Sequence, residues 1–471
     1  MISFDQGDRD VPRVVISGIG LVSPLGFDRE TTWSNLLASK LAIRQLGSGE
    51  VDHFSELQQI AQLRLFGAPV DHSEVLTRLE RLSDLRPSAP CTVSGKLLDP
   101  VVAMSLLACH EALQQAGLPL NVGEHYRTGC TYGASKGGLR SIERLLTPSE
   151  DGVSMDESQE RQLGDMWWYS AQTDSATRAM AAMTKVKAFM ACPVAACATG
   201  LISILQAALA IRSGQCDVCI AGSSDAAIRA SVLSSFHRLR VTSRHPVAAS
   251  ACRPFDRDRD GFAIGEGAGV LILESESSAS RRGVRPLARL SAGGWLSDST
   301  GMTQIDTSGS VVAELLSRTL QALSDKRPVD YVNLHGTGTE SNDLAEGLGM
   351  KHCFQNAIPP CSGFKGQIGH LLGGASSVET GLTILAMRDQ VLPASANLFA
   401  MDERLTLPLV REHQRGVSVD RVMKLSLGFG GHVACAVFDQ PHDSDLPRDS
   451  SYCGSRASAS SEPARNRTSL T

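Results

Sequence analysis

The stretch CPVAACATGLISILQAALAIRSG, residues 192–214, decides the fold, because it places a cysteine among very small residues and then begins a helix at once. Apolar side chains recur at helical spacing from Leu201 to Leu209, and Thr199 and Gly200 lie in the first predicted turn. The pattern predicts a buried helix that begins just after Cys197.

Cys197 has two interpretations at this position. The positive end of the helix dipole and the unpaired backbone N–H groups would lower the pKa of the thiol from its usual value of about 8.5 and favour a thiolate. The small neighbouring side chains would leave room for a substrate carbonyl beside the sulfur. Buried cysteines among alanines are nevertheless common as apolar filler, and this segment taken alone favours filler.

Length and composition are those of a globular protein with a sizeable core. The chain has 471 residues, 42% of them hydrophobic, and its net charge of −5 gives no nucleic-acid footprint. No apolar run reaches the roughly 18 to 20 residues that span a bilayer. The acidic N-terminal stretch also lacks the design of a signal peptide. We therefore expect a cytoplasmic protein with no membrane span and no nucleic-acid partner.

Neither the cysteines nor the glycines predict a metal or nucleotide site. Twelve cysteines in such a chain indicate reduced thiols, and the CxxC pair of Cys216 and Cys219 has no second pair at zinc-finger spacing. Gly18 and Gly20 form a GxG after the first predicted strand, but the third glycine and the acidic partner of a dinucleotide site are missing. We expect no metal and no cofactor.

Strands and helices alternate along the body of the chain, which predicts a mixed α/β fold. A polar and basic stretch at 274–290 separates two such runs. We predict an N-terminal half at 13–275, which carries Cys197, and a C-terminal half at 276–440. Residues 441–471 are rich in Ser, Arg and Pro and predict a disordered tail.

Two histidines in glycine-rich loops favour the interpretation of Cys197 as a reactive thiol over that of apolar filler. His335 follows a predicted strand in NLHGTGTESND, and His370 lies in GFKGQIGHLLGGA, where the backbone can approach a ligand closely. Lys365 lies five residues before His370, and Glu379 lies nine residues after it. A lysine and a glutamate can fix the tautomer and charge of an imidazole, although a surface ion pair is the alternative.

Six motifs then occur in a fixed order: VVISGIGLVSPLG, AACATG, RPFDRDRDGFAIGEGAG, HGTGTESND, KGQIGHLLGGA and LGFGGH. Together they resemble the β-ketoacyl-acyl carrier protein synthases of the elongating type, from about residue 13 to residue 440. Histidine at both 335 and 370 is similar to the elongating enzymes, whereas the initiating synthases have His and Asn.

The resemblance implies a thiolase-like fold. This fold has two similar α/β halves, each with a five-stranded mixed sheet, in a five-layer αβαβα arrangement. The implied reaction is a decarboxylative Claisen condensation of an acyl group with malonyl-acyl carrier protein, in fatty-acid or polyketide-type chain elongation. Both substrates would be carried on the phosphopantetheine of the carrier, so no further cofactor is expected.

The same resemblance implies a role for the cysteine, for both histidines and for the lysine and glutamate near His370. Cys197 would be the nucleophile that takes the acyl chain. His335 and His370 would hold the malonyl thioester carbonyl as carbon dioxide leaves, by donating hydrogen bonds to the enolate oxygen. Lys365 and Glu379 would form a buried pair that orients the second histidine.

Further matches extend this implied site. The backbone N–H groups of Cys197 and Phe429 would form the oxyanion hole, and Phe429 would also gate the acyl pocket. The remaining matches are two threonines that would bind pantetheine and two structural acids: Thr337, Thr339, Asp343 and Glu346.

An acidic acyl carrier protein would need a locally basic docking surface. The segment FHRLRVTSRH supplies Arg238, Arg240 and Arg244, although a solvated face is the alternative. We predict Arg240 and Arg244 as docking residues and acyl carrier protein as the partner. We also predict a homodimer, with a heterodimer with a related subunit as the alternative.

The chain departs from the family pattern in three places. Ala195 stands where Thr is usual and Leu425 where Asn is usual, and neither change removes a reacting group. From 155 to 193 the usual dimer and acyl-pocket residues are replaced. The aromatic run at 167–169, WWY, would either reshape substrate choice or serve ordinary core packing.

Two other classes of protein remain as alternatives. A non-catalytic partner similar to the chain-length factors would keep the fold, but such proteins characteristically lose the nucleophile that is present here. A thiolase that uses coenzyme A would need a second cysteine near the C-terminal glycines. Cys435 is the candidate for that cysteine, and it lies in a predicted strand.

Overall fold

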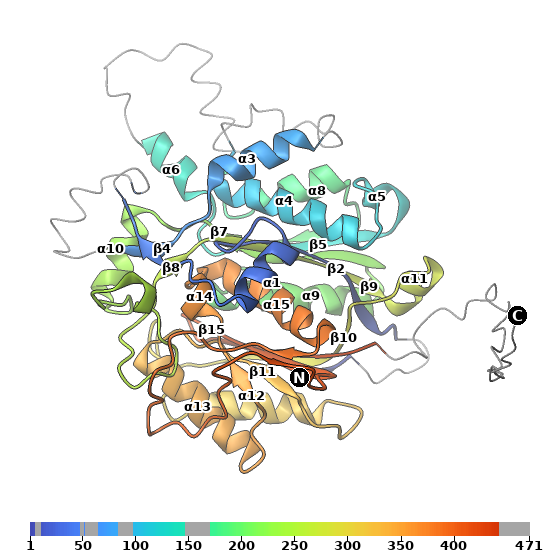
Figure 1. The fold of residues 1–471 in the computed structure, drawn as a ribbon. Helices are drawn as coiled ribbons and strands as arrows, with labels where there is room; N and C mark the ends of the chain where they lie inside the picture. Colours follow the sequence, from blue (N-terminus) through green and yellow to red (C-terminus); the bar gives the residue numbers. More distant parts are fainter. Residues whose placement is uncertain (5–10, 48–50, 52–64, 83–97, 147–169, 442–471) are drawn as a thin grey trace, which may run out of the picture.

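Each half of the chain contributes a five-stranded run of sheet (Figure 1). The computed structural model describes residues 1–4, 11–47, 51, 65–82, 98–146 and 170–441. Within them, the strands of the first half lie in the order β2 (Val14–Val22), β9 (Gly267–Ser275), β7 (Val218–Asp225), β5 (Thr128–Ala134) and β6 (Phe189–Ala191). Those of the second half lie in the order β10 (Ala288–Ser297), β16 (His432–Asp439), β15 (Arg421–Gly428), β11 (Tyr331–Asn333) and β12 (Cys361–Ser362).

The two runs share one topology. In each, the two pairings nearest the centre are antiparallel and the two outer pairings are parallel. β2 and β10 also pair, with Ile16 opposite Ala288, which joins the two runs into one continuous path of strands. The predicted architecture of two similar α/β halves is therefore confirmed.

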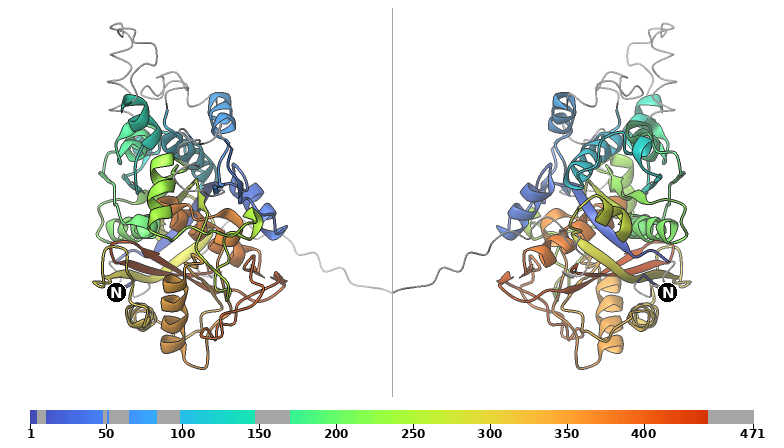
Figure 2. Two further views of the ribbon diagram at one scale, coloured as in Figure 1. Left: turned by 90° about the vertical axis from the view of Figure 1, so that its left-hand side faces the viewer. Right: turned by 90° about the vertical axis from the view of Figure 1, so that its right-hand side faces the viewer.

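Three layers of helix enclose the two runs of strand (Figure 1). The central layer consists of α9 (Thr199–Arg212) and α15 (Ala375–Arg388). On the outer faces, α4 (Pro100–Gln115) and α8 (Ser175–Thr184) cover the first run, and α12 (Ser310–Gln321) and α13 (Glu340–Phe354) cover the second. The side views of Figure 2 show the blue to green helices of the first half at the top and the outer orange helices of the second half at the bottom.

Shorter elements lie in the connections. The helices are α1 (Arg29–Leu37), α3 (His72–Arg81), α5 (Val122–His125), α6 (Leu139–Leu146), α10 (Ala230–Arg238), α11 (Glu276–Arg281) and α14 (Lys365–Ile368). β3 (Arg44–Gln45), β4 (Phe66–Ala68) and β8 (Ile264–Gly265) form one small sheet, β13 (Val391–Leu392) and β14 (Gln414–Arg415) form another, and β1 (Ile2–Ser3) pairs with β10. In the described part of the chain, no helix has the length and apolar character needed to cross a membrane.

The predicted boundaries can be located on these elements. The division between residues 275 and 276 falls where β9 ends and α11 begins. The predicted disordered tail lies outside the described residues except for residue 441, and so does the aromatic run at 167–169.

α9 and α15 are buried on nearly every side because each lies between two sheets. Their N-terminal turns approach so closely that a Cβ at Gly200 would lie 2.0 Å from the Oγ of Ser377. α9 begins at Thr199, which confirms the predicted helix start after Cys197. The thiol is thereby brought to the meeting point of the two central helices.

The GxG of the first strand has a packing role. β2 lies directly under α4, and a Cβ at Gly20 would lie 1.8 Å from the carbonyl oxygen of Ala108. Gly18 meets Ala112 in the same way, at 2.1 Å. These glycines are needed for the approach of a strand to a helix.

Candidate active site

Cys197 lies in a tight turn between β6 and α9. Ala196, the residue before it, adopts a left-handed backbone conformation with φ 47°, and a short 3-10 turn covers Ala196–Ala198. The Oγ of Ser426 on β15 donates a hydrogen bond to the carbonyl oxygen of Cys197 at 3.2 Å. This turn fixes the half-buried sulfur at the N-terminus of α9.

The two predicted histidines converge on that sulfur. The Nε2 of His370 lies 3.1 Å from the Sγ of Cys197, and the rings of His335 and His370 meet edge to face with centroids 5.3 Å apart. One side-chain atom from each of the three residues lies within 4.8 Å of the others. The structure therefore joins one residue from the first half with two from the second.

Hydrogen bonds fix the tautomer of both imidazoles. The backbone N–H of Leu372 donates to the Nδ1 of His370 at 3.3 Å, and the ammonium of Lys365 donates to the Nδ1 of His335 at 3.2 Å. Burial and the charge of Lys365 hold the pKa of both histidines well below the usual value, so the rings are neutral. A neutral ring whose Nδ1 accepts must carry its proton on Nε2.

The Nε2–H groups of the two imidazoles suit a negatively charged oxygen better than a metal ion. Cysteine and histidine are common metal ligands, but a histidine can bind a metal only through an unprotonated nitrogen. Here each Nε2 carries a proton, and the ammonium of Lys365 lies next to His335. Two N–H donors directed into one site can instead stabilise an oxyanion that forms there.

The buried pair of Lys365 and Glu379 is present, but its predicted partner is wrong. The Nζ of Lys365 lies 2.6 Å from the Oε1 of Glu379 and 2.5 Å from the carbonyl oxygen of His335, besides its contact with the ring of His335. The pair therefore orients the first histidine, not His370. The sequence was misleading because α14 directs the lysine back toward the end of β11, away from the nearer histidine.

Two buried acids hold the loop that follows β11, as expected for structural acids. Glu346 accepts from the backbone N–H groups of His335 and Gly336 at 2.5 and 2.6 Å. Asp343 accepts from Phe255 at 2.7 Å and from Gly338 at 3.2 Å. Burial raises the pKa of Glu346 to about 7.

A narrow cavity of about 70 Å³ leads to the sulfur. Six of the predicted site residues line it: Cys197, His335, Thr337, Thr339, His370 and Phe429. The hydroxyl groups of the two threonines lie 2.9 Å apart. Phe429 stacks on Phe236, with ring centroids 6.2 Å apart, so aromatic rings flank the passage.

Gly428 brings β15 against the cysteine turn. A Cβ on this glycine would lie 3.2 Å from the backbone nitrogen of Cys197, and Phe429 is the next residue. The backbone of Phe429 therefore follows directly on the contact with the Cys197 turn, where the resemblance implies an oxyanion hole.

The pKa of the Cys197 thiol is raised, whereas the sequence predicted that it would be lowered. Burial raises the pKa of Cys197 to about 11, whereas the charges of Lys136 and Lys365 act in the opposite direction. The sequence predicted a lowered pKa from the helix dipole alone. That prediction omitted the desolvation of the sulfur, which disfavours a charged thiolate.

Three charged residues of the site were missed. The Nζ of Lys136 lies 3.6 Å from the Oδ2 of Asp225 and 5.6 Å from the ring centroid of Phe236. Asp225 accepts from the backbone of Gly373, close to His370. Lys424 contacts Glu379 at 2.6 Å. Only Lys424 had a sequence signal, namely a lysine inside an apolar strand pattern.

Two departures from the family pattern face away from the chemistry. Leu425 packs in the outer core between the second run of strands and α12, on the face of β15 opposite Ser426. Ala195 is buried, and its N–H donates to the Oγ1 of Thr199 at 2.9 Å. Neither side chain contacts the reacting groups.

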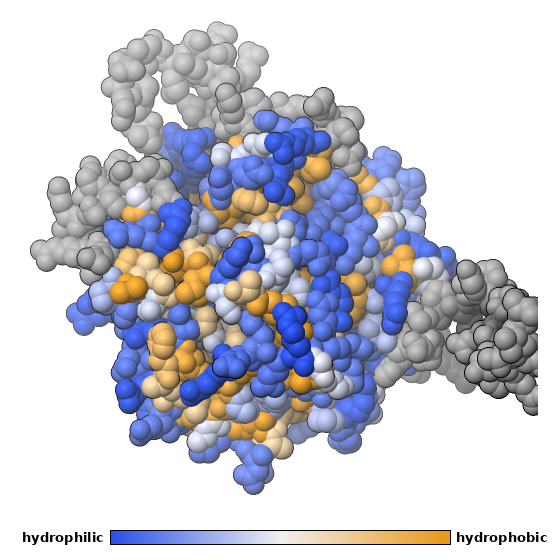
Figure 3. All heavy atoms as spheres, viewed as in Figure 1, coloured by the Kyte–Doolittle hydropathy of each residue, from blue (hydrophilic) through white to orange (hydrophobic). Residues whose placement is uncertain are grey.

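The predicted docking arginines belong to a segment that contributes to the cavity wall. Arg240 and Arg244 are exposed, and Phe236 and Val241 of the same segment line the cavity wall. Leu239 is 47% exposed, and Figure 3 shows apolar residues gathered around α10 among charged ones. The segment thus presents both charge and apolar surface at the entrance.

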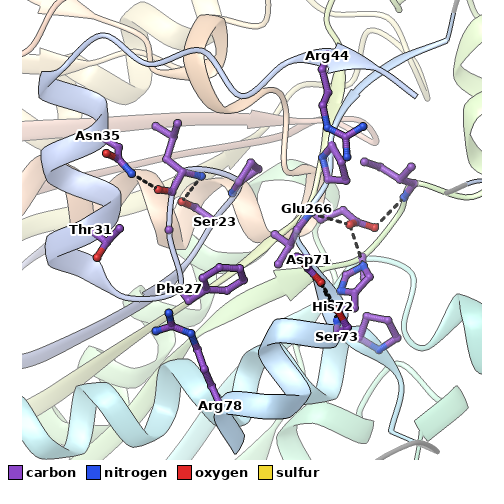
Figure 4. Close-up of a pocket in the computed structure, with 18 of the residues that line it drawn as sticks. Ser23, Phe27, Thr31, Asn35, Arg44, Asp71, His72, Ser73, Arg78 and Glu266 are labelled. Carbon is purple, nitrogen blue, oxygen red and sulfur yellow. Dashed lines mark hydrogen bonds and ion pairs between the residues drawn. The ribbon is translucent and has the colours of Figure 1, made fainter. Parts of the chain in front are cut away.

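A second, larger cavity of about 790 Å³ lies near α3 (Figure 4). Its wall contains the ion pair of half-buried His72 and buried Glu266, with Nε2 and Oε2 3.0 Å apart. Glu266 also accepts from the backbone of Val70 and Ile228. Among the described residues, its lining includes no cysteine, so we assign the nucleophilic chemistry to the Cys197 cavity.

Comparisons with known proteins agree with this geometry. Residues 12–279 match the family model described as "Beta-ketoacyl synthase, N-terminal domain", and residues 287–399 match "Beta-ketoacyl synthase, C-terminal domain". The chain is 31% identical over 431 residues to "3-oxoacyl-[acyl-carrier-protein] synthase 2" of Mycobacterium bovis, which covers 91% of this chain and 97% of that protein.

Two further similarities extend across nearly the same length. A protein of Streptomyces rimosus, "Oxytetracycline polyketide putative beta-ketoacyl synthase 1", is 31% identical over 445 residues, covering 92% of this chain and 98% of that protein. Among solved structures, a type II polyketide synthase acyl-carrier protein complex with its ketosynthase contains a chain with the same fold. The TM-score is 0.77 at 23% identity, covering 92% of this chain and 100% of that chain.

Proposed function

The chain belongs to the β-ketoacyl synthase family, and we propose that Cys197, His335 and His370 carry its chemistry. Like its relatives, it is a ketosynthase, an acyltransferase that joins an acyl group to a malonyl unit by decarboxylative Claisen condensation. One observation carries the assignment of roles: a cysteine sulfur at a helix N-terminus meets two neutral imidazoles that each keep a proton on Nε2.

In the first step, Cys197 attacks the thioester carbonyl of an acyl carrier protein. The new bond joins the sulfur to the acyl carbon, the bond to the pantetheine sulfur breaks, and that sulfur leaves with the proton that the thiol has lost. His370 donates its Nε2–H toward Sγ and so stabilises the developing thiolate, which burial otherwise disfavours.

In the second step, the Nε2–H groups of His335 and His370 donate to the thioester oxygen of the malonyl unit. The C–C bond to the carboxylate breaks, carbon dioxide leaves, and the electron pair moves into the thioester to form an enolate. Preorganised donors favour this step because they interact more strongly with the enolate oxygen than with the ground-state carbonyl.

In the third step, the enolate carbon attacks the carbonyl of acyl-Cys197. The tetrahedral oxyanion accepts from the backbone N–H groups of Cys197 and Phe429. Its collapse expels the Cys197 sulfur as a thiolate, which takes up a proton from water to regenerate the thiol. Thr337 and Thr339 line the approach to the sulfur and would bind the pantetheine arm. The product is a β-ketoacyl group on the carrier, and no further cofactor is needed.

Mass spectrometry tests the first step. Incubation with a panel of acyl carrier thioesters should add one acyl group to Cys197, and malonyl carrier protein should then remove it as a β-ketoacyl product. Cys197→Ala should abolish the adduct, whereas Cys192→Ala, five residues away, should keep it. An adduct that persists in Cys197→Ala would contradict the proposal.

The same experiment separates the enzyme from a chain-length-factor-like subunit. Such a subunit would accept no acyl group with any thioester. The nucleophile and both imidazoles are in contact range here, which favours the enzyme. Elongation in a fatty-acid or a polyketide pathway fits equally with the relatives, and we propose the cytoplasm as its location.

We propose that acyl carrier protein docks on Arg240 and Arg244. Both are exposed on the segment that supplies Phe236 and Val241 to the cavity wall, and both would pair with an acidic partner. Arg240→Glu and Arg244→Glu should each raise the KM for carrier substrates about tenfold, through loss of one charge pair and gain of a repulsion. Turnover of small thioester analogues should stay unchanged, and equal carrier kinetics would refute this docking surface.

A dimer through β6 is the assembly that we propose. Among the described strands, β6 ends the strand path, and it exposes Met190 at 53%. An unpaired strand edge with apolar side chains favours pairing with a second chain. Sedimentation should show a dimer, either of identical chains or with a related subunit, and Met190→Lys should weaken it. A monomer at micromolar concentration would contradict the proposal.

A further inference from the structure

A second buried lysine reaches the carboxylate that pairs with Lys365. The Nζ of Lys424 on β15 lies 2.6 Å from the Oε2 of Glu379, and the Nζ of Lys365 lies 2.6 Å from the Oε1. All three side chains are 0% exposed. Two ammonium groups on one carboxylate leave one net positive charge next to His335.

Lys424 also connects the cluster of Lys365, Glu379 and Lys424 to the backbone of the active site. Its Nζ donates to the carbonyl oxygen of Leu334 at 3.5 Å, and Lys365 donates to the carbonyl oxygen of the next residue, His335. On β15, Lys424 and Ser426 point to the same face, and Ser426 donates to the carbonyl of Cys197. One strand thus supports both the imidazole loop and the cysteine turn.

We propose that Lys424 is a positioning residue for the decarboxylation step: through Glu379 and Lys365 it holds His335 as a neutral Nε2–H donor, and it places one net positive charge beside the enolate. The inference rests on the proposed function. As the C–C bond to the malonyl carboxylate breaks and carbon dioxide leaves, the electron pair moves onto the thioester oxygen. A nearby positive charge lowers the energy of that enolate more than that of the neutral carbonyl.

A purely structural role does not account for the second lysine. Lys365 and Glu379 alone would form a neutral pair, and a further buried ammonium adds a desolvation cost. The charge of Glu379 is already balanced by Lys365, so charge balance does not require the second ammonium. Its presence therefore fits a functional reason.

The charged surroundings set the pH range over which Lys424 acts. It faces Glu379 on α15, Lys365 on α14 and Glu346 on α13, and its charge acts on both active-site histidines and on Cys435 of β16. Burial lowers the pKa of Lys424 to about 8, although Glu379 opposes this. The ammonium is present below pH 8 and is lost as the pH rises above it.

Lys424→Met is the principal test, because methionine keeps the length of the side chain without its charge. Carbon dioxide release from malonyl carrier protein should fall about tenfold. Acylation of Cys197 should change less than about twofold, because the sulfur contacts His370 and the charge of Lys424 is not among the main effects on the pKa of the thiol. The melting temperature should fall less than the decarboxylation rate would suggest, because Glu379 keeps Lys365 as its charged partner. Lys351→Met, exposed on α13, is the control and should change none of these.

The pH profile supplies a second readout. In the unmodified protein, the kcat for decarboxylation should fall as the pH rises through about 8, with the charge of Lys424. This alkaline limb should disappear in Lys424→Met, and the acid limb should move to higher pH because the pKa of each histidine rises. Lys424→Arg keeps a charge above pH 8 and should move the limb upward, which also decides the matter if the methionine variant does not fold.

Three results would overturn the inference while the proposed function stands. One is an unmodified protein that releases carbon dioxide with no limb near pH 8. Another is a Lys424→Met variant with the rate and profile of the unmodified protein. The third is an equal fall of acylation, decarboxylation and melting temperature in that variant. If the unmodified protein accepts no acyl group at Cys197, the proposed function itself fails.

Discussion

At the scale of single residues, opposing effects act on the Cys197 sulfur. The N-terminus of α9 and the charges of Lys136 and Lys365 favour the thiolate, whereas burial disfavours it and raises the pKa of the thiol to about 11. The sulfur is therefore a protonated thiol at rest. Its contact with the Nε2–H of His370 supplies stabilisation when the substrate carbonyl arrives.

Lys136→Met should make the thiol less acidic. Its ammonium is the largest charge effect that lowers the pKa of Cys197, so its removal should move the rate of alkylation by iodoacetamide to higher pH, by about one pH unit. Mass spectrometry of the alkylated peptide across pH measures the shift. Lys187→Met, exposed and remote from the cavity, should leave the profile in place, and a downward shift in Lys136→Met would contradict this account.

At the scale of elements, the two halves begin their central helices in the same way. A residue in the left-handed conformation, Ala196 with φ 47° or Leu372 with φ 48°, opens a short 3-10 turn, and α9 or α15 follows directly. These two turns approach one another at Gly200. The thiol of Cys197 and His370 are held together by this helix contact.

Gly200→Ala should therefore destabilise the fold by about 1 to 3 kcal/mol, because the new methyl group meets Ser377 and Ser223 with no space to move into. Urea unfolding measures the change. Ser213→Ala at the exposed end of the same helix should stay within about 0.5 kcal/mol. Equal stability of Gly200→Ala and the unmodified protein would show that α9 and α15 can separate freely.

At the scale of the whole molecule, the site exists only because the two halves are interlocked. The first half supplies Cys197 and the second supplies both imidazoles, Lys365 and Lys424. The pairing of β2 with β10 and the shared central layer fix one half against the other. Either half alone would present a cysteine without the Nε2–H donors or two histidines without the cysteine.

The ion pair in the wall of the cavity near α3 makes the stability of the protein depend on pH (Figure 4). Burial lowers the pKa of His72, but the ion pair with Glu266 outweighs this effect and raises it. The protonated histidine therefore contributes its full stabilisation below pH 6.5. This stabilisation is lost as the pH rises through the raised pKa. The pKa of Glu266 is lowered by the same pair against the effect of burial, so its contribution is present above pH 4.5 and is lost below the lowered pKa.

His72→Gln should thus lower the free energy of unfolding by about 1 to 3 kcal/mol near pH 6 and by less at pH 9. Thermal or urea unfolding at the two pH values measures the difference. His125→Gln, exposed at the end of α5, should change stability little at either pH. A loss in His72→Gln that grows toward pH 9 would contradict the sign of the effect.

Local patterns determined much of this protein. Alternating strands and helices and the apolar run after Cys197 sufficed to predict a mixed α/β fold and a buried helix that begins just after Cys197. The ordered motifs were specific enough to predict both histidines, Phe429 and the structural acids. These features depend on residues near one another in sequence, where spacing translates directly into geometry.

Contacts between distant segments could be decided only by the tertiary structure. Lys365 orients His335 and not the nearer His370, because the direction of α14 sets its reach. The pKa of the thiol depends on how completely the surrounding layers exclude water, which spacing does not encode. Lys424 acquires its role because β15 passes beside α15, so that two lysines far apart in the chain meet one carboxylate.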